Sequence, residues 1–194
     1  MVDITIMIKT KGIRKLNNNH GMTLTEVLCA TLLVGLVSLC LATGVTLASK
    51  QFKSSIRLSE AQELYATLES LLSNELRYTN EVNLSDTNEV DTFFSVTYAL
   101  KNAKTKLYAL DDAGNVTNDY GELAMGDEES KSYNRLLGNA SYTNNLGAKA
   151  TITYNKEKEL FTVNLDIGVV GGSSVVQKSF DVRAMNNVIV GDNS

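Results

Sequence analysis

The apolar residues of this chain are concentrated in one uninterrupted run near its N-terminus. Val27 to Ala48 contains no charged residue, and leucine, valine and alanine dominate it. At about 1.5 Å per residue, a helix of this length spans about 33 Å, which matches the roughly 30 Å hydrocarbon thickness of a bilayer. We therefore expect a helix over residues 22–48 that crosses a membrane once.

A second periodic segment follows the first. Its apolar residues recur at three- and four-residue spacing while charged residues occupy other positions, which is the pattern of an amphipathic helix. The apolar positions are Ala61, Leu64, Leu68, Leu71 and Leu72, and the charged ones are Glu60, Glu63, Glu69 and Arg77. No proline interrupts residues 25–78, so the pattern predicts one nearly continuous helix of about 80 Å. Its amphipathic half, residues 49–80, should pack on a folded domain.

After residue 80 the pattern changes to the two-residue alternation of β-strands. The clearest case is a hairpin, Ala150–Tyr154 and Leu160–Ile167, joined by the charged residues 155–159. Alternation in its second strand predicts an antiparallel sheet with one buried face. Other strand signals are Phe94, Val96 and Tyr98, then Leu107 and Leu110 before a turn at Asp111–Asn115, and Val176, Phe180 and Val182 after a turn at Gly171–Ser174. The fold class expected is α+β, with the helix packed on a sheet built from residues 81–194.

Residues 115–148 show neither periodicity. They are rich in asparagine, glycine and acidic residues, and we expect a long irregular connection, a kind of segment that often carries function. Acidic residues in and beside it, with Asp111, Asp112 and Asp119 as the candidates, could supply oxygen ligands to calcium. They lack the spacing of an EF-hand, and a solvated acidic surface is the favoured interpretation. We expect no cofactor.

Charge places the chain relative to the membrane and excludes one class of partner. Four basic residues precede the apolar run, Lys9, Lys11, Arg14 and Lys15, and by the positive-inside rule they keep the N-terminus cytoplasmic and the C-terminal domain outside. Lys50, Lys53 and Arg57 on the other flank reduce this asymmetry. The formal charge is -4 for the whole chain and about -7 without residues 1–21. Direct nucleic-acid binding is not expected, because it needs a basic surface to neutralise phosphates.

The two cysteines predict no cross-link in the exterior domain. Cys29 and Cys40 both lie in the apolar run. On one helix their axial separation is about 16 Å, which is beyond the reach of a disulfide. The expected role of both thiols is apolar packing.

Glu26 is the acidic residue that opens the apolar run. Burying an isolated carboxylate in hydrocarbon is costly, so an ionisable residue there indicates function. It ends the segment Gly21–Glu26, which has basic residues before it and the apolar run after it. This boundary resembles the class III signal of type IV prepilins and type II secretion pseudopilins. The resemblance covers residues 9–52. Met22 replaces the usual phenylalanine, and the proline that bends many pilin helices is missing.

The resemblance implies a set of roles for these residues. A membrane-embedded prepilin peptidase would remove a leader, residues 1–21, by cutting after Gly21, and would methylate the new amine of Met22. The chain would then be a pilin or pseudopilin, with a minor subunit favoured, in a type IV pilus, a competence pilus or a type II secretion pseudopilus. Its partners would be other such subunits, the peptidase, the membrane and an assembly platform. It would be a substrate rather than an enzyme, and loss of His20 with the leader would leave no histidine for catalysis.

Two interpretations of Glu26 remain open at this point. In the first, its carboxylate pairs with the Met22 amine of a neighbouring subunit, which would offset the burial cost of both charges. In the second, Glu26 caps its own helix, where the helix dipole favours a negative charge. Thr23 and Thr25 are polar residues that suit the helix start. A different class of function, a membrane-anchored adhesin or binding domain that never polymerises, is the alternative for the whole chain.

Overall fold

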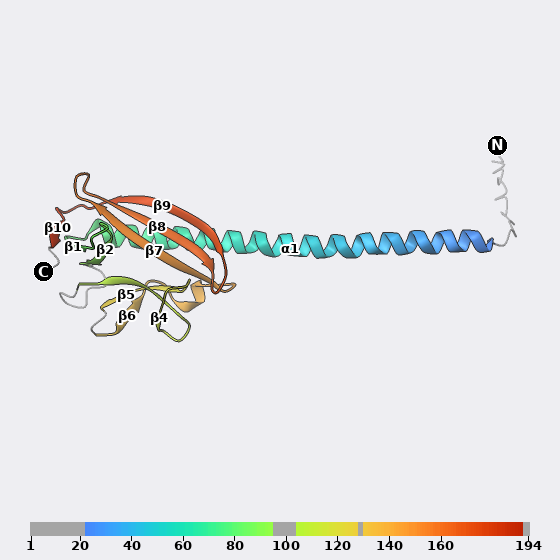
Figure 1. The fold of residues 1–194 in the computed structure, drawn as a ribbon, viewed down its shortest axis with the longest axis horizontal. Coiled ribbons are helices and arrows are strands. Elements are labelled where there is room, and N and C mark those ends of the chain that lie inside the picture. Colours follow the sequence, from blue (N-terminus) through green and yellow to red (C-terminus); the bar gives the residue numbers. More distant parts are fainter. Residues whose placement is uncertain (1–21, 95–103, 128–129, 192–194) are drawn as a thin grey trace, which may run out of the picture. The chain divides into compact units, whose positions relative to one another are not determined.

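A computed structural model describes residues 22–94, 104–127 and 130–191, and the described chain opens with one long helix (Figure 1). This helix, α1, runs from Leu24 to Arg77 without interruption, as the absence of proline predicts. The chain divides into two compact units, residues 1–49 and 50–194, and α1 contributes to both. The predicted leader, including Gly21, lies outside the described residues.

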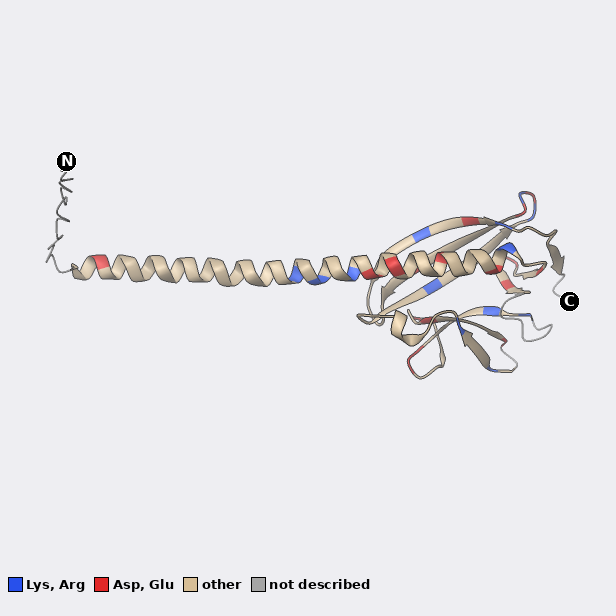
Figure 2. Ribbon diagram, turned by 180° about the vertical axis from the view of Figure 1, so that it is seen from behind, with Lys and Arg blue, Asp and Glu red and all other residues tan. Residues whose placement is uncertain are grey.

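In the first unit, α1 carries no charged residue after Glu26. Every described residue from Met22 to Ser49 is exposed. The next charged residue along the sequence is Lys50, and Figure 2 shows a long tan stretch of α1 between a red and a blue segment. Among the described residues, one helix is long and apolar enough to cross a membrane, and it is this one.

Within the residues that the structure describes, the second unit contains the last part of α1 and ten strands. The strands are β1 (Glu81–Leu84), β2 (Val90–Phe93), β3 (Lys106–Leu110), β4 (Val116–Thr117), β5 (Glu122–Asp127), β6 (Ser132–Arg135), β7 (Leu146–Asn155), β8 (Leu160–Val169), β9 (Ser174–Arg183) and β10 (Ile189–Gly191). A short 3-10 helix, η1 (Asn139–Ser141), precedes β7. The strands form three sheets, with orders β10-β1-β2, β4-β3-β5-β6 and β7-β8-β9. All pairs are antiparallel except β1 with β10, which confirms the α+β fold with an antiparallel sheet against the helix.

One stripe of α1 forms the centre of the core of this unit. The predicted positions Ala61, Leu64, Leu68 and Leu72 are buried, and Tyr65 and Leu76 extend the stripe. They share one cluster with the inward-facing residues of β8, which are Phe161, Val163, Leu165 and Ile167. The Tyr65 ring meets the Phe180 ring of β9 edge-on at a centroid distance of 6.3 Å. The amphipathic half of the helix therefore packs on the sheet as predicted.

The predicted hairpin and last strand are present and longer than expected. β7 pairs with β8 in an unbroken antiparallel register from Leu146 opposite Val169 to Asn155 opposite Leu160, and β9 pairs with the other edge of β8. Leu107 and Leu110 lie in β3, and the turn that follows begins at Asp111. Phe94 comes directly after β2, whereas Val96 and Tyr98 lie outside the described residues.

The expectation that residues 115–148 form an irregular connection is wrong. This stretch contains β4, β5, β6 and the first residues of β7. β5 is buried on both faces: Leu123 and Met125 lie in the main core, and Ala124 packs with Tyr108 and Leu110 in a smaller cluster. A strand buried on both faces has no apolar–polar alternation, and β5 is also short and contains glycine, so the sequence pattern did not reveal it.

Two glycines of the β7–β8 pair make room for a tyrosine. Gly147 and Gly168 are directly opposite each other. The Tyr120 ring lies so close that a Cβ on Gly168 would stand 2.4 Å from Cζ of that ring. The Tyr120 hydroxyl donates to Oδ2 of Asp166 at 2.9 Å, and the hydroxyl of Ser174 donates to Oδ1 of the same carboxylate. The glycines thus allow the segment before β5 to pack on the long sheet.

We predict that Gly168→Ala lowers the free energy of unfolding by about 2 kcal/mol, because an extra methyl group in a filled site forces the ring or the strand to move. Gly138→Ala is the matched control, since a Cβ there meets no atom within 4 Å and the backbone φ is -66°. Urea unfolding of the full chain in detergent compares the two variants. Equal stability of both would contradict the packing role of Gly168.

A second prediction concerns Tyr142, whose hydroxyl accepts the Leu123 N–H at 2.9 Å. Burial raises the pKa of Tyr142 to about 12, the Leu123 N–H opposes this rise, and the charge of Glu122 adds to it. The pKa of Tyr142 in the folded state exceeds its unfolded value near 10. The contribution of protonated Tyr142 to folding stability is therefore complete below about pH 10 and is lost as the pH rises towards 12.

Tyr142→Phe should therefore be less stable at neutral pH by about 1 kcal/mol, since it leaves the Leu123 N–H without its acceptor. Its stability should also fall less than that of the wild type between about pH 10 and pH 12. Tyrosinate absorbance and circular dichroism during an alkaline titration measure both effects. Tyr78→Phe, at an exposed position, is the control, and an identical alkaline profile for wild type and Tyr142→Phe would contradict the assignment.

Candidate functional site

Thr23 and Glu26 hold the start of α1 by reciprocal hydrogen bonds. The Glu26 N–H donates to Oγ1 of Thr23 at 3.3 Å. In return, Oε2 of Glu26 accepts the Thr23 N–H at 2.9 Å and the Thr23 hydroxyl at 3.0 Å. This arrangement is a capping box, which satisfies N–H groups that the first turn of a helix leaves without partners. In this structure Glu26 therefore caps its own helix.

The capping box assigns different roles to the two threonines that sequence analysis treated alike. Thr23 is the N-cap residue, and the capping bonds at the helix start are made by Thr23 and Glu26. The signal was present in the sequence, because threonine followed three residues later by glutamate is the capping-box spacing. Met22 is exposed directly before the cap.

The two hydrogen bonds that the Glu26 carboxylate accepts from Thr23 use the same oxygen. Oε2 accepts both bonds from Thr23, and Oε1 is directed to no donor within the described part of the chain. A carboxylate oxygen can accept more than one hydrogen bond. The cap thus fixes the position of the carboxylate while leaving it able to accept a further donor.

The hydroxyl groups of the apolar half of α1 are satisfied within the helix, a feature that the sequence analysis did not identify. Thr31 donates to the carbonyl of Leu28 at 2.9 Å, and Ser38 donates to that of Val34 at 2.7 Å. Thr43 and Thr46 make similar bonds to carbonyls three or four residues earlier. Such bonds are the usual local alternative to an external partner. This surface can therefore contact lipid or another helix without leaving a hydroxyl unpaired.

The glycines of this segment are not required by the packing of the chain itself. A Cβ on Gly35 or Gly44 would meet no atom within 4 Å. Gly35 lies in a shallow apolar depression of the helix surface between Thr31, Leu32 and Leu39. Small residues on a membrane helix let another helix approach closely. Any role of Gly35 is therefore external to this molecule.

Two of the acidic candidates for calcium, Asp111 and Asp119, accept hydrogen bonds from donors of their own chain. Oδ1 of Asp111 accepts the backbone N–H of Asn115 at 2.7 Å and Oδ2 accepts its side-chain N–H at 3.2 Å, and these two bonds lower the pKa of Asp111. Asp119 accepts the N–H groups of Tyr120 at 2.7 Å and Gly171 at 2.9 Å, which lower its pKa in the same way. Both carboxylates stabilise turns.

The arrangement of the remaining acids does not favour a metal site. Asp112 lines a cavity of about 470 Å³ with Asp111 and Glu122, but Glu122 is buried and its carboxylate pairs with Arg135. Among the described residues, no three histidine, cysteine, aspartate or glutamate side chains converge as metal ligands would. Glu128 and Glu129 lie outside the described residues.

Comparison with protein-family models, with curated proteins and with solved structures finds no match to this chain. The architecture is therefore described from the geometry of this chain alone. A long N-terminal helix, apolar in its first half, packs its second half on antiparallel β-sheets, which is a pilin-like arrangement.

Proposed function

We propose that this chain is the precursor of a pilin or pseudopilin, a subunit that polymerises into a filament through the apolar half of α1. The observation that carries the proposal is the position of Glu26. Its carboxylate is fixed by the Thr23 cap at the start of an exposed apolar helix. It lies four residues after Met22, the residue on which cleavage after Gly21 would create a cationic amine.

In this proposal, Glu26 of one subunit pairs with the Met22 amine of the next. The capping box does not compete with such a pair, because the Thr23 N–H remains an amide after cleavage and Oε1 is available to the amine. Two charges at the border of an apolar medium cost much less when paired than when separate. A subunit inserted at the wrong level leaves both unpaired, so the pair favours one axial position.

The surface of the first unit is consistent with both environments that the proposal requires. Before assembly, the helix would lie in the membrane with the second unit outside. After assembly, the same leucines and valines would pack against neighbouring helices, with Gly35 allowing close approach. The internal hydrogen bonds of Thr31 and Ser38 remain intact through the transfer. The partners are other subunits, the prepilin peptidase and an assembly platform, and the chain itself has no catalytic role.

The first test is the mass of the N-terminus of the mature protein. We expect a chain that begins with N-methylated Met22 when the protein is expressed with a prepilin peptidase, and an intact chain when the peptidase is absent. Intact-protein and N-terminal peptide mass spectrometry distinguish these species. A mature chain that retains Met1, or that begins near Ser49, would support the non-polymerising anchored domain instead.

The second test separates the charge of Glu26 from its capping role. Glu26→Gln keeps an acceptor for the Thr23 N–H, since glutamine also serves in capping boxes, but it removes the charge. Thr23→Val removes the cap at a cost of about 1 kcal/mol and keeps the charge. We expect Glu26→Gln to abolish filament assembly and Thr23→Val to retain most of it, as measured by sedimentation and electron microscopy of filaments. The reverse ranking would make capping the function of Glu26 and sink the pairing role.

A further inference from the structure

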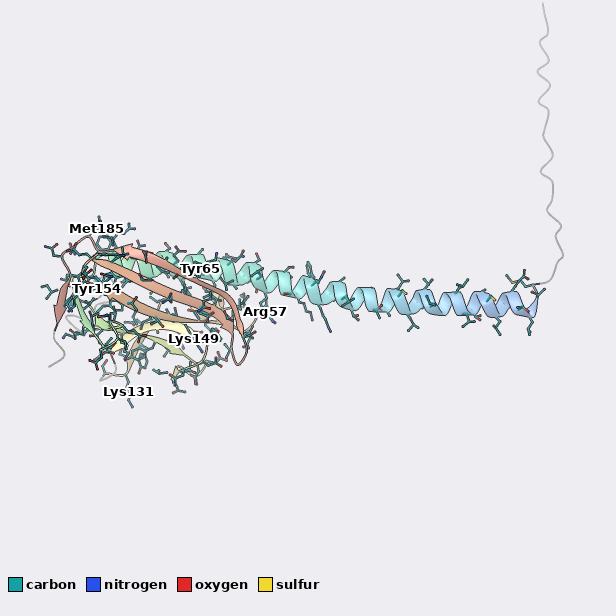
Figure 3. The ribbon with its side chains drawn as sticks, turned by 45° about the horizontal axis from the view of Figure 1, so that its top comes forward. Arg57, Tyr65, Lys131, Lys149, Tyr154 and Met185 are labelled. Carbon is teal, nitrogen blue, oxygen red and sulfur yellow. The ribbon has the colours of Figure 1, made fainter. Side chains whose placement is uncertain are left out.

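Three basic residues form a band on α1 immediately after the apolar segment. Lys50, Lys53 and Arg57, hereafter the basic band, have i, i+3 and i+7 spacing, so they share one face of the helix. All three are exposed. The ion pairs of the described residues are made by other cations, namely Lys104, Lys106, Arg135 and Lys149. Figure 3 places Arg57 near the end of the β7-β8-β9 sheet.

Two glutamates follow the basic band on the same helix and border a cavity. Glu60 and Glu63 line a space of about 220 Å³ between α1 and the segment around η1, together with Thr67, Leu137 and Thr143. We call this site the acidic notch. The Glu60 carboxylate accepts the side-chain N–H of Asn144, which holds it at the notch, and Glu63 is exposed. Figure 2 shows the blue and red segments following each other along α1.

The two charged groups have complementary spacing. Glu63 lies six residues after Arg57, and Glu60 lies seven residues after Lys53, which correspond to axial separations of about 9 and 10.5 Å. A single shift of about 10 Å along the helix axis therefore brings both basic residues of one copy level with both glutamates of another. Arg57 and Glu60 stand at a spacing that allows a pair within one helix, but the structure pairs Glu60 with Asn144 instead.

We propose that the basic band of one copy of this chain docks on the acidic notch of the next copy, with Arg57 facing Glu63 and Lys53 facing Glu60. This inference rests on the proposed function, because it requires parallel copies in one filament. At about 100° per residue, the basic band and the two glutamates of the acidic notch face directions about 80° apart around the helix axis. The contact is therefore heterologous, and a heterologous contact that does not close into a ring propagates as an open helical filament.

The docking contact and the Met22–Glu26 pair require a shift in the same direction. In both cases the cationic group of one copy lies closer to the N-terminus than the carboxylate it meets on the other. The Met22–Glu26 pair corresponds to about 6 Å along the axis. The difference of about 4 Å from the docking shift is less than the length of an extended arginine side chain. The Met22–Glu26 pair belongs to the first unit and the docking contact to the second. Each contact would separately favour one axial position of a subunit relative to its neighbour.

A basic band beside an apolar helix segment could also attract lipid phosphates. The acidic notch favours a second copy, since a lipid surface would give Glu60 and Glu63 no cation to meet. The matched spacing of the two pairs favours the same partner. Binding to lipid is therefore the competing outcome of the experiment.

Exchanging the charges of one pair tests the proposal in the full-length protein. Arg57→Glu and Glu63→Arg, each alone, should reduce the yield of sedimented filaments by about tenfold, because each places like charges together. The double variant should recover a yield within about threefold of the wild type, because the exchanged pair again attracts. The matched control combines Arg57→Glu with Gln62→Arg. It introduces the same arginine side chain at an exposed neighbouring position on a different face, leaves Glu63 in place, and should not recover.

The possible results separate this proposal from the proposed function. If wild-type protein forms filaments and Glu26→Gln does not, while the single reversals assemble normally or the double variant does not recover, docking at the notch is overturned and the pilin assignment stands. If Arg57→Glu instead loses binding to phosphatidylglycerol vesicles and the double variant stays defective, the band binds lipid and docking is overturned. Wild-type protein that is cleaved before Met22 yet never polymerises overturns both proposals. Resistance of each variant to protease confirms that its fold is intact.

Discussion

The second unit depends on the burial of one stripe of α1. Four residues of this stripe have no exposed surface, namely Ala61, Leu68, Leu72 and Leu76. They share a cluster with the long β7-β8-β9 sheet and with β5, the strand that is buried on both faces. The buried apolar residues of that sheet and Leu123 and Met125 of β5 therefore lie in one core with the helix stripe. Because these contacts fix the last turns of α1 in the unit, they also fix the charged residues that precede the stripe.

The two halves of α1 have the same backbone and opposite surroundings. The second half finds its partners in its own chain, whereas the first half exposes leucine and valine along its whole described length. Exposed apolar surface on this scale requires a partner outside the molecule, either lipid or other helices. Its hydroxyls bond to the helix backbone, so neither partner has to supply hydrogen bonds. The charged residues that border this surface are Glu26 at one end and Lys50 at the other.

The acidic residues of the second unit illustrate how tertiary context assigns a role to a charge. Asp119 joins two turns by accepting the N–H groups of Tyr120 and Gly171, and it also pairs with Lys149 at 3.6 Å. Lys149 in turn lies 4.4 Å from the centroid of the Tyr120 ring. These contacts surround the site where Tyr120 packs on the glycine pair. Asp119 thus stabilises the connection between two sheets through contacts within its own chain.

The sequence by itself determined the elements whose residues repeat with a single period. The apolar run, the stripe from Ala61 to Leu72 and the β7–β8 hairpin follow from local spacing, because each has one buried or one apolar face. The capping box of Thr23 and Glu26 was also encoded locally, three residues apart. Only the tertiary structure decided that β5 is a strand, since burial on both faces removes alternation, and that Tyr120 occupies the space left by two glycines far away in sequence. Those roles depend on neighbours that local spacing does not specify.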